Sequence, residues 1–131
     1  VFEDYPGVIS NVLSGVDTRH VALITSVDGV IRGQHYHPEA GGTQYVYVLS
    51  GRLEAHLQAL SVISVVGQPS VESPLGPVLQ VDLVPDDLLR LDPYTAHAFK
   101  ARGDTTFLAL DEYPATPEVY AEVTRPFKVI E

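Results

Sequence analysis

Cysteine is absent from this chain. Its absence excludes disulfides, thiolate nucleophiles and cysteine-ligated metals together. Basic residues are also scarce, because 8 Lys and Arg stand against 17 Asp and Glu, and the formal net charge is -9. A field of this sign repels polyanions, so we expect neither a nucleic-acid partner nor a membrane partner.

Long apolar segments are missing as well. The longest charge-free run, 55–71, is interrupted by Gln, Ser and Pro and is too polar to span a bilayer. No signal-peptide pattern opens the chain, and we expect a cytoplasmic protein. The 131 residues suffice for one ordinary domain with its own core, so we expect a single domain over 1–131.

Short runs rich in Val, Ile, Leu, Thr and Tyr recur along most of the chain, separated by Gly, Pro or Asp-Gly. These runs predict strands at 7–13, 19–26, 30–36, 43–49, 52–57, 61–66, 78–83, 88–91, 96–100 and 105–110. So many short strands at this spacing indicate an all-β sandwich or barrel. The Pro- and Gly-rich segment 67–77 is expected to be a loop or an irregular crossing between strands.

A single helix is predicted near the C-terminus. Thr116 can act as N-cap, Pro117 suits the first helical position, and Glu118 places an acid in the first turn. We therefore expect one short C-terminal helix after an otherwise all-β chain.

The residues that can carry chemistry are four polar side chains on predicted strands. Residues two apart on a strand point to the same face, so His35 and His37 present two imidazoles side by side. Gln44, at the start of the next strand, can bring an amide oxygen to that face, and a barrel can fold His97 back beside it. The alternative is a polar barrel interior that holds no ligand.

Five residues have the spacing of the first cupin motif: Gly29, His35, His37, Gln44 and Gly51. The segment 93–97 resembles a shortened second cupin motif. The resemblance implies a small antiparallel barrel of the cupin or jelly-roll type in which three histidines and one amide hold a divalent metal. The implied metal ligands are His35, His37, Gln44 and His97. Imidazole ligands suit a transition metal such as Fe, Ni, Zn, Cu or Mn, and no organic cofactor is expected.

A narrower resemblance is to the nucleotide-sugar cupins, the dTDP-4-dehydrorhamnose 3,5-epimerases and dTDP-4-keto-sugar 3,4-ketoisomerases. It rests on the order of five short segments, 4–7, 32–36, 73–76, 93–99 and 111–113. It implies that His35 removes a proton next to a ketone and that Tyr113 serves as the acid. Since the ordinary pKa of imidazole is about 6.5, we expect His35 to act without a large pKa shift. Arg32, next to the histidine pair, is the candidate contact for a substrate anion.

Three functions therefore remain open. The first is an epimerase or isomerase that acts on a nucleotide-linked keto-sugar by proton transfer through His35. The second is a metal-dependent oxygenase, lyase or isomerase with a site of three histidines and Gln44, and the third is a non-catalytic cupin that binds a small molecule. Each implies a small-molecule partner. We also expect a homodimer, because a small barrel leaves edge strands that need covering. His20 fits no motif and is expected to be a surface or packing residue.

Overall fold

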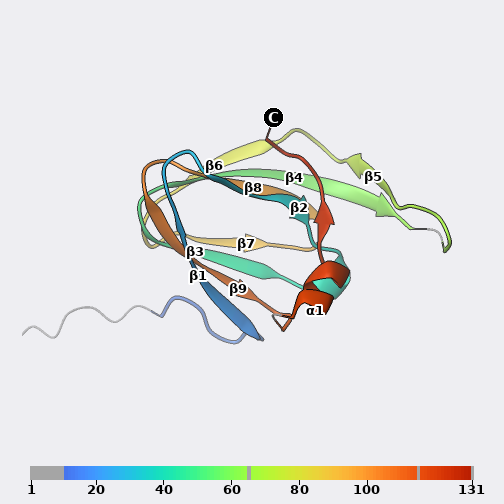
Figure 1. The fold of residues 1–131 in the computed structure, drawn as a ribbon, viewed down its shortest axis with the longest axis horizontal. Helices are drawn as coiled ribbons and strands as arrows, with labels where there is room; N and C mark the ends of the chain where they lie inside the picture. The colour runs from blue at the N-terminus through green and yellow to red at the C-terminus, as the bar shows by residue number, and fades with distance from the viewer. Residues whose placement is uncertain (1–10, 65, 115, 131) are drawn as a thin grey trace, which may run out of the picture.

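The computed structural model describes residues 11–64, 66–114 and 116–130. The elements follow in the order β1 (His20–Ser26), β2 (Ile31–Tyr36), the 3-10 helix η1 (Glu39–Gly41), β3 (Gln44–Ser50), β4 (Leu53–Ile63), β5 (Val71–Pro74), β6 (Leu79–Leu83), β7 (Leu88–Leu91), β8 (Thr95–Ala101), β9 (Thr105–Asp111), α1 (Pro117–Glu122) and β10 (Arg125–Pro126) (Figure 1). Within the described residues no helix has the length and apolar character needed to cross a membrane.

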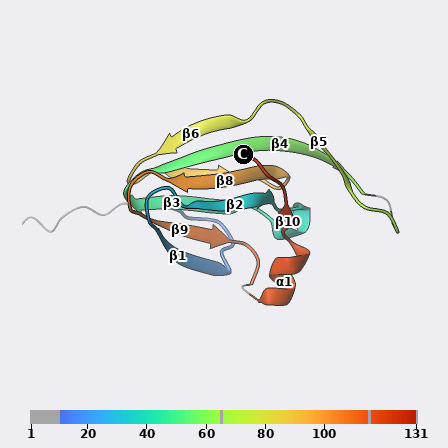
Figure 2. The ribbon, with the colours of Figure 1, turned by 45° about the horizontal axis from the view of Figure 1, so that its top comes forward.

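Two antiparallel sheets curl toward each other to form the barrel (Figures 1 and 2). The four-stranded sheet has the order β1-β9-β3-β7, and the larger sheet has the order β10-β2-β8-β4-β5, with β6 also paired to β4. This arrangement confirms the predicted all-β antiparallel barrel with a short C-terminal helix. β1 and β7 are the edges of the smaller sheet, and the homodimer that such edges suggest stays a prediction.

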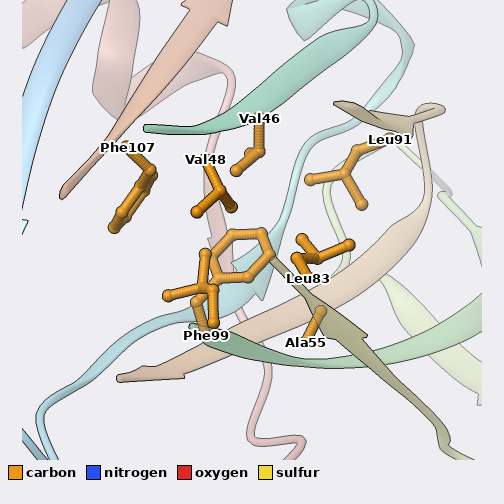
Figure 3. Close-up of a cluster of buried hydrophobic side chains, with 8 residues drawn as sticks. Val46, Val48, Ala55, Leu83, Leu91, Phe99 and Phe107 are labelled. Carbon is orange, nitrogen blue, oxygen red and sulfur yellow. The ribbon is translucent and has the colours of Figure 1, made fainter. Parts of the chain in front are cut away.

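The apolar core lies between the two sheets (Figure 3). Its eight buried members are Val46, Val48, Leu53, Ala55, Leu83, Leu91, Phe99 and Phe107. Val46 and Val48 lie two apart on β3, so strand alternation turns both side chains inward. The rings of Phe99 and Phe107 lie 6.2 Å apart between centroids and join the two sheets.

Several element boundaries differ from the sequence-based prediction. The strands predicted at 52–57 and 61–66 form one continuous strand, β4, because Gln58 and Ser61 keep the ladder hydrogen bonds despite their polar side chains. The predicted loop 67–77 contains β5, which pairs with the distal half of β4. The strand predicted at 7–13 lies largely outside the described residues, and residues 11–13 are not in a strand.

The C-terminal segment closes one end of the barrel. Thr116 caps α1 as predicted, since its side chain accepts a hydrogen bond from the Val119 amide at 3.2 Å. After α1, β10 pairs with the end of β2, an element for which the sequence carries no signal. The Gln34 side chain binds the following chain, donating to the Ile130 carbonyl at 2.7 Å and accepting from the Val129 amide at 2.6 Å. Figures 1 and 2 show α1 beside the ends of β2 and β9.

Candidate active site

Two rows of polar residues cross the barrel at the end that α1 covers. On the smaller sheet, Asp111 at the end of β9 is paired with His20 on β1 and with Gln44 on β3. On the larger sheet, His35 on β2 is paired with His97 on β8. Directly paired residues share a face of a sheet, so each row presents its side chains together.

A β-bulge in β2 sets the position of His35. The register shifts between Gly33 and His35, and Gly33 and Gln34 have φ angles of 93° and 63°. In a regular ladder without this bulge, His97 would be paired with Gln34, and His35 would face the other side of the sheet. A Cβ on Gly33 would lie 2.8 Å from the His97 carbonyl oxygen, so glycine is required by space as well as by φ.

Three imidazoles converge at this position. The ring centroid of His35 lies 4.8 Å from that of His37 and 4.6 Å from that of His97, and the His37–His97 distance is 5.4 Å. One nitrogen from each ring lies within 4.8 Å of the others. His37 and His97 are buried and His35 is partly buried. The three histidines singled out in the sequence are therefore brought together.

Backbone carbonyls orient two of these rings. The His37 Nδ1 donates to the Val123 carbonyl at 2.6 Å, and the His97 Nδ1 donates to the Thr95 carbonyl at 3.0 Å. Since a carbonyl oxygen only accepts, both rings carry their proton on Nδ1 and keep a lone pair on Nε2. The His37 Nε2 is buried and has no hydrogen-bond partner within the described part of the chain.

Burial keeps these histidines neutral. Burial and the nearby His37 lower the pKa of His35 to about 4, and burial together with His35 lowers the pKa of His97 to about 3. Burial also lowers the pKa of His37. The expectation that His35 works without a large pKa shift is therefore wrong, because burial, together with the neighbouring imidazole of His37, disfavours the charged ring. At neutral pH the cluster offers lone pairs, which is the state that binds a transition metal.

The row on the smaller sheet is a hydrogen-bonded network centred on Asp111. This carboxylate is only 4% exposed. Its Oδ1 accepts a hydrogen bond from the Gln44 Nε2 at 2.6 Å, and its Oδ2 lies 3.1 Å from the His20 Nδ1. Gln44 thus has its amide nitrogen engaged and its amide oxygen left over. Asp111 lies in the segment 111–113 that carries part of the family resemblance, but the sequence assigns it no role. His20, expected to be a surface or packing residue, instead lines the cavity beside Asp111.

A cavity of about 400 Å³ joins the two rows. The polar residues that line it are His20, His35, His37, Gln44, Asp111 and Tyr113, and Tyr120 lines it from α1. A smaller cavity of about 140 Å³ is lined by Arg32, His97 and Phe99 among others. His35 and Gln44 line both cavities, so these two residues stand between them.

Tyr113 lines the larger cavity and Arg32 lines the smaller one. The Tyr113 ring is 8% exposed and 5.8 Å from the His37 ring, and burial and the charge of Asp111 raise the pKa of its phenol. The Arg32 Nε donates to the Ser26 hydroxyl at 2.6 Å, and one terminal nitrogen donates to the Thr25 carbonyl at 3.0 Å. Arg32 is exposed and is the only Lys or Arg among the described residues that line the two cavities.

Solved structures share this fold. The dTDP-4-dehydrorhamnose 3,5-epimerase of Sulfolobus tokodaii matches with a TM-score of 0.69 at 18% identity, over 95% of this chain and 71% of that chain. NovW of Streptomyces spheroides, a 4-keto-6-deoxy sugar epimerase, matches with a TM-score of 0.63 at 22% identity, over 83% of this chain and 51% of that one. CapF of Staphylococcus aureus, a capsular polysaccharide assembling protein, matches with a TM-score of 0.66 at 14% identity, over 86% of this chain and 28% of that one.

This chain spans less than two thirds of CapF and of NovW. No protein-family model and no curated protein gives a significant match. The structural matches confirm the resemblance in fold that the sequence motifs suggested. The chain shares its barrel fold with these sugar epimerases.

Proposed function

We propose that this protein is an enzyme that epimerises or isomerises a nucleotide-linked keto-sugar by moving a proton next to the ketone. The observation that carries the proposal is the placement of a neutral imidazole, His35, and a protonated phenol, Tyr113, on the wall of one cavity of about 400 Å³. The barrel shared with epimerases of such sugars supports the substrate class.

His35 is the proposed base. Because its pKa lies well below 7, the imidazole is unprotonated at neutral pH and can accept a proton from the carbon beside the ketone. The C–H bond pair then moves to the carbonyl oxygen and forms an enolate. The charge on this enolate stabilises the imidazolium formed beside it, which offsets the cost of charging a partly buried ring.

Tyr113 and Arg32 are the proposed electrophilic groups. The raised pKa of Tyr113 keeps its phenol protonated, so it can donate a hydrogen bond to the oxygen that carries the enolate charge. Arg32 can pair with the diphosphate of the substrate, and with a net charge of -9 such a local cation is needed to offset the repulsive field.

Deuterium exchange tests this function. The protein is incubated in heavy water with a dTDP-linked 4-keto-6-deoxy sugar, and deuterium should enter the position beside the ketone. His35→Asn should slow exchange by about 10² to 10⁴, the usual contribution of a general base. A matched control is His56→Asn, since His56 faces away from the barrel interior and hydrogen-bonds Glu54 at 2.7 Å. Absence of exchange with the unmodified protein, or full exchange in His35→Asn, would contradict the proposal.

A second candidate function is a metal-dependent enzyme, and one specific observation favours it. The buried His37 Nε2 lacks a partner among the described residues, and its ring is held by the Val123 carbonyl in the orientation that a ligand needs. We propose that His35, His37 and His97, with the Gln44 amide oxygen, would hold a divalent Fe, Ni, Zn, Cu or Mn ion. A metal bound there would supply Lewis-acid or redox chemistry to a substrate in the cavity.

Metal analysis tests this candidate without an activity assay. Protein purified without a His-tag and loaded with each divalent ion in turn should retain about one equivalent of the preferred metal. His37→Ala combined with His97→Ala should retain none, whereas His56→Asn should bind like the unmodified protein. Equal retention in the double variant would exclude this cluster as the metal site. Deuterium exchange that survives complete metal removal would favour the metal-free mechanism.

A further inference from the structure

His20 and Asp111 form an acid–base pair that faces the same cavity from the other sheet. Asp111 is nine-tenths buried and His20 is about one-third exposed, with Nδ1 3.1 Å from the Asp111 Oδ2. His20 and Asp111 both line the cavity of about 400 Å³, together with His35 on the larger sheet. The substrate space therefore lies between a histidine on β1 and a histidine on β2.

The network fixes which nitrogen of His20 is free. The Asp111 Oδ1 already accepts from the Gln44 amide, so Asp111 acts as an acceptor on both oxygens. The His20 Nδ1 must then carry a proton toward Oδ2, which leaves Nε2 as the nitrogen that can gain or release a proton. A buried carboxylate in this position orients the ring and directs Nε2 away from Asp111.

The environment of His35, in the three-histidine cluster, differs from that of His20. His35 has another imidazole within 5 Å on each side and no carboxylate among the groups that shift its pKa. Tyr113, the acid that the family resemblance implies, holds its proton more tightly than a free phenol because of burial and the Asp111 charge. The cavity thus contains a neutral imidazole, His35, and a phenol that holds its proton tightly, Tyr113, and on the opposite sheet it is lined by the histidine that a carboxylate orients, His20.

We propose that His20, oriented by Asp111, is the acid that delivers a proton to the enolate carbon from the side opposite His35. This inference rests on the proposed function, because it assigns the second proton transfer of the same reaction. The position of His20 and His35 on different sheets places the acid and the base on different walls of the cavity, as a change of configuration at one carbon requires.

The proton balance is complete without a further reactant. In the first transfer the C–H bond breaks, its proton goes to His35, and the electron pair moves to the carbonyl oxygen. In the second, the pair returns to carbon, a new C–H bond forms with the proton from the His20 Nε2, and the carbonyl is restored. His20 is left neutral, with its remaining proton on Nδ1 and hydrogen-bonded to the Asp111 Oδ2. Solvent then takes the proton from His35 and returns one to His20.

The other titratable groups that line the same cavity are Asp111 and Tyr113 from the β9 end, His35 and His37 from the β2 end, and Tyr120 from α1. Among these, only Asp111 lies within hydrogen-bond distance of His20. Asp111 is therefore treated as a positioning residue and His20 as the catalytic one.

The experiment separates proton removal from proton delivery. His20→Asn, Tyr113→Phe and the control His56→Asn are compared using a dTDP-linked 4-keto-6-deoxy sugar in heavy water. For His20→Asn, deuterium exchange should stay within about twofold of the unmodified protein, while formation of the epimerised or isomerised sugar should fall by about 10² to 10⁴. Tyr113→Phe should lower both rates together, since it removes a hydrogen bond to the enolate oxygen. His56→Asn should change neither.

A spectroscopic measurement tests the role of Asp111. In ¹⁵N-histidine NMR spectra, the His20 ring should show the Nδ1-protonated tautomer in the unmodified protein and a loss of that preference in Asp111→Asn. Asp111→Asn should also show the same split between exchange and product as His20→Asn. If the buried substitution prevents folding, the exposed His20→Asn variant still decides the proposal.

Each outcome bears on the proposal. An unchanged rate of product formation in His20→Asn overturns the proposal. If Tyr113→Phe is the only variant that keeps deuterium exchange but loses product formation, the acid is Tyr113. An equal loss of exchange and product in His20→Asn also overturns it, because that result would mean a role in binding or structure. No exchange in the unmodified protein with any such sugar overturns the proposed function and this inference together.

Discussion

The two ends of the barrel interior are built from the same strands and carry opposite chemistry. β8 contributes Phe99 to the apolar core and, two residues earlier, His97 to the site. β3 contributes Val48 to the core and Gln44 to the site, and β9 contributes Phe107 to the core. Residues an even number of positions apart on a strand point to the same face, so the core and site side chains of each strand all point inward. The core and the site therefore differ in residue type and not in backbone geometry.

This difference separates stability from function. The apolar end removes large side chains from water, which is the main favourable contribution to folding. The histidine end buries polar groups, and each buried polar group that lacks a hydrogen-bond partner lowers the stability of the folded state. Backbone carbonyls satisfy the Nδ1 atoms of His37 and His97, whereas the His37 Nε2 is left without a partner among the described residues. We expect substitutions at the two ends to have separable effects.

The largest effect is expected at the apolar end. Phe107 is 2% exposed and packs on Phe99 across the two sheets. Phe107→Ala should lower the free energy of unfolding by about 3 to 5 kcal/mol, the usual cost of deleting a buried ring and leaving a cavity. Urea denaturation measures this change. The folded fraction should still bind metal at the histidine cluster if the two ends are independent. A loss of less than about 1 kcal/mol would contradict the expectation that the Phe107 ring is a main support of the fold.

A pH effect of intermediate size is expected at the histidine end of the metal-free protein. The pKa of His35 is about 4 in the folded state against an ordinary 6.5. Above pH 6.5 the ring is neutral in both states and contributes nothing. Between pH 6.5 and 4 the unfolded chain binds a proton that the folded protein does not, so stability falls as the pH falls. At about 1.4 kcal/mol per pKa unit, the loss from His35 is on the order of 3 kcal/mol.

Denaturation curves at a series of pH values measure this loss, and the two ends give matched variants. Phe107→Ala should lower stability by the same amount at every pH and leave the slope intact. His35→Asn should remove part of the slope between pH 6.5 and 4. A slope unchanged by His35→Asn would show that other groups control acid unfolding.

The smallest stability change is expected when the site end is made to resemble the core. His97 is 2% exposed, neutral, and bonded only to the Thr95 carbonyl among the described residues. His97→Leu exchanges one buried neutral side chain for an apolar one of similar volume, so stability at pH 7 should change by less than about 1 kcal/mol. Metal retention, measured by elemental analysis, should nevertheless be lost. A large loss of stability together with loss of metal would mean that this histidine also holds the barrel together.

Local patterns in the sequence predicted much of the architecture. Alternation at His35 and His37 placed both imidazoles on one face, and the cap at Thr116 located α1 to the residue. The barrel topology was needed to bring His97 to the same place, and the motif spacing anticipated it. These predictions succeeded because strand alternation and helix capping depend on residues close together in the chain.

Other features depended on how distant strands pair. The bulge at Gln34, which moves His35 opposite His97, becomes visible only when β2 is paired with β8. The His20–Asp111 pair joins residues 91 positions apart, and nothing near His20 in the sequence marks it. The lowered pKa values of the histidines arise from burial and from one another's proximity. By itself the sequence determined most of the strands, the short helix and the identity of the three histidines. The tertiary structure decided their register, their neighbours and their charge state, because pairing, burial and electrostatic interaction depend on distances in space and not on distances along the chain.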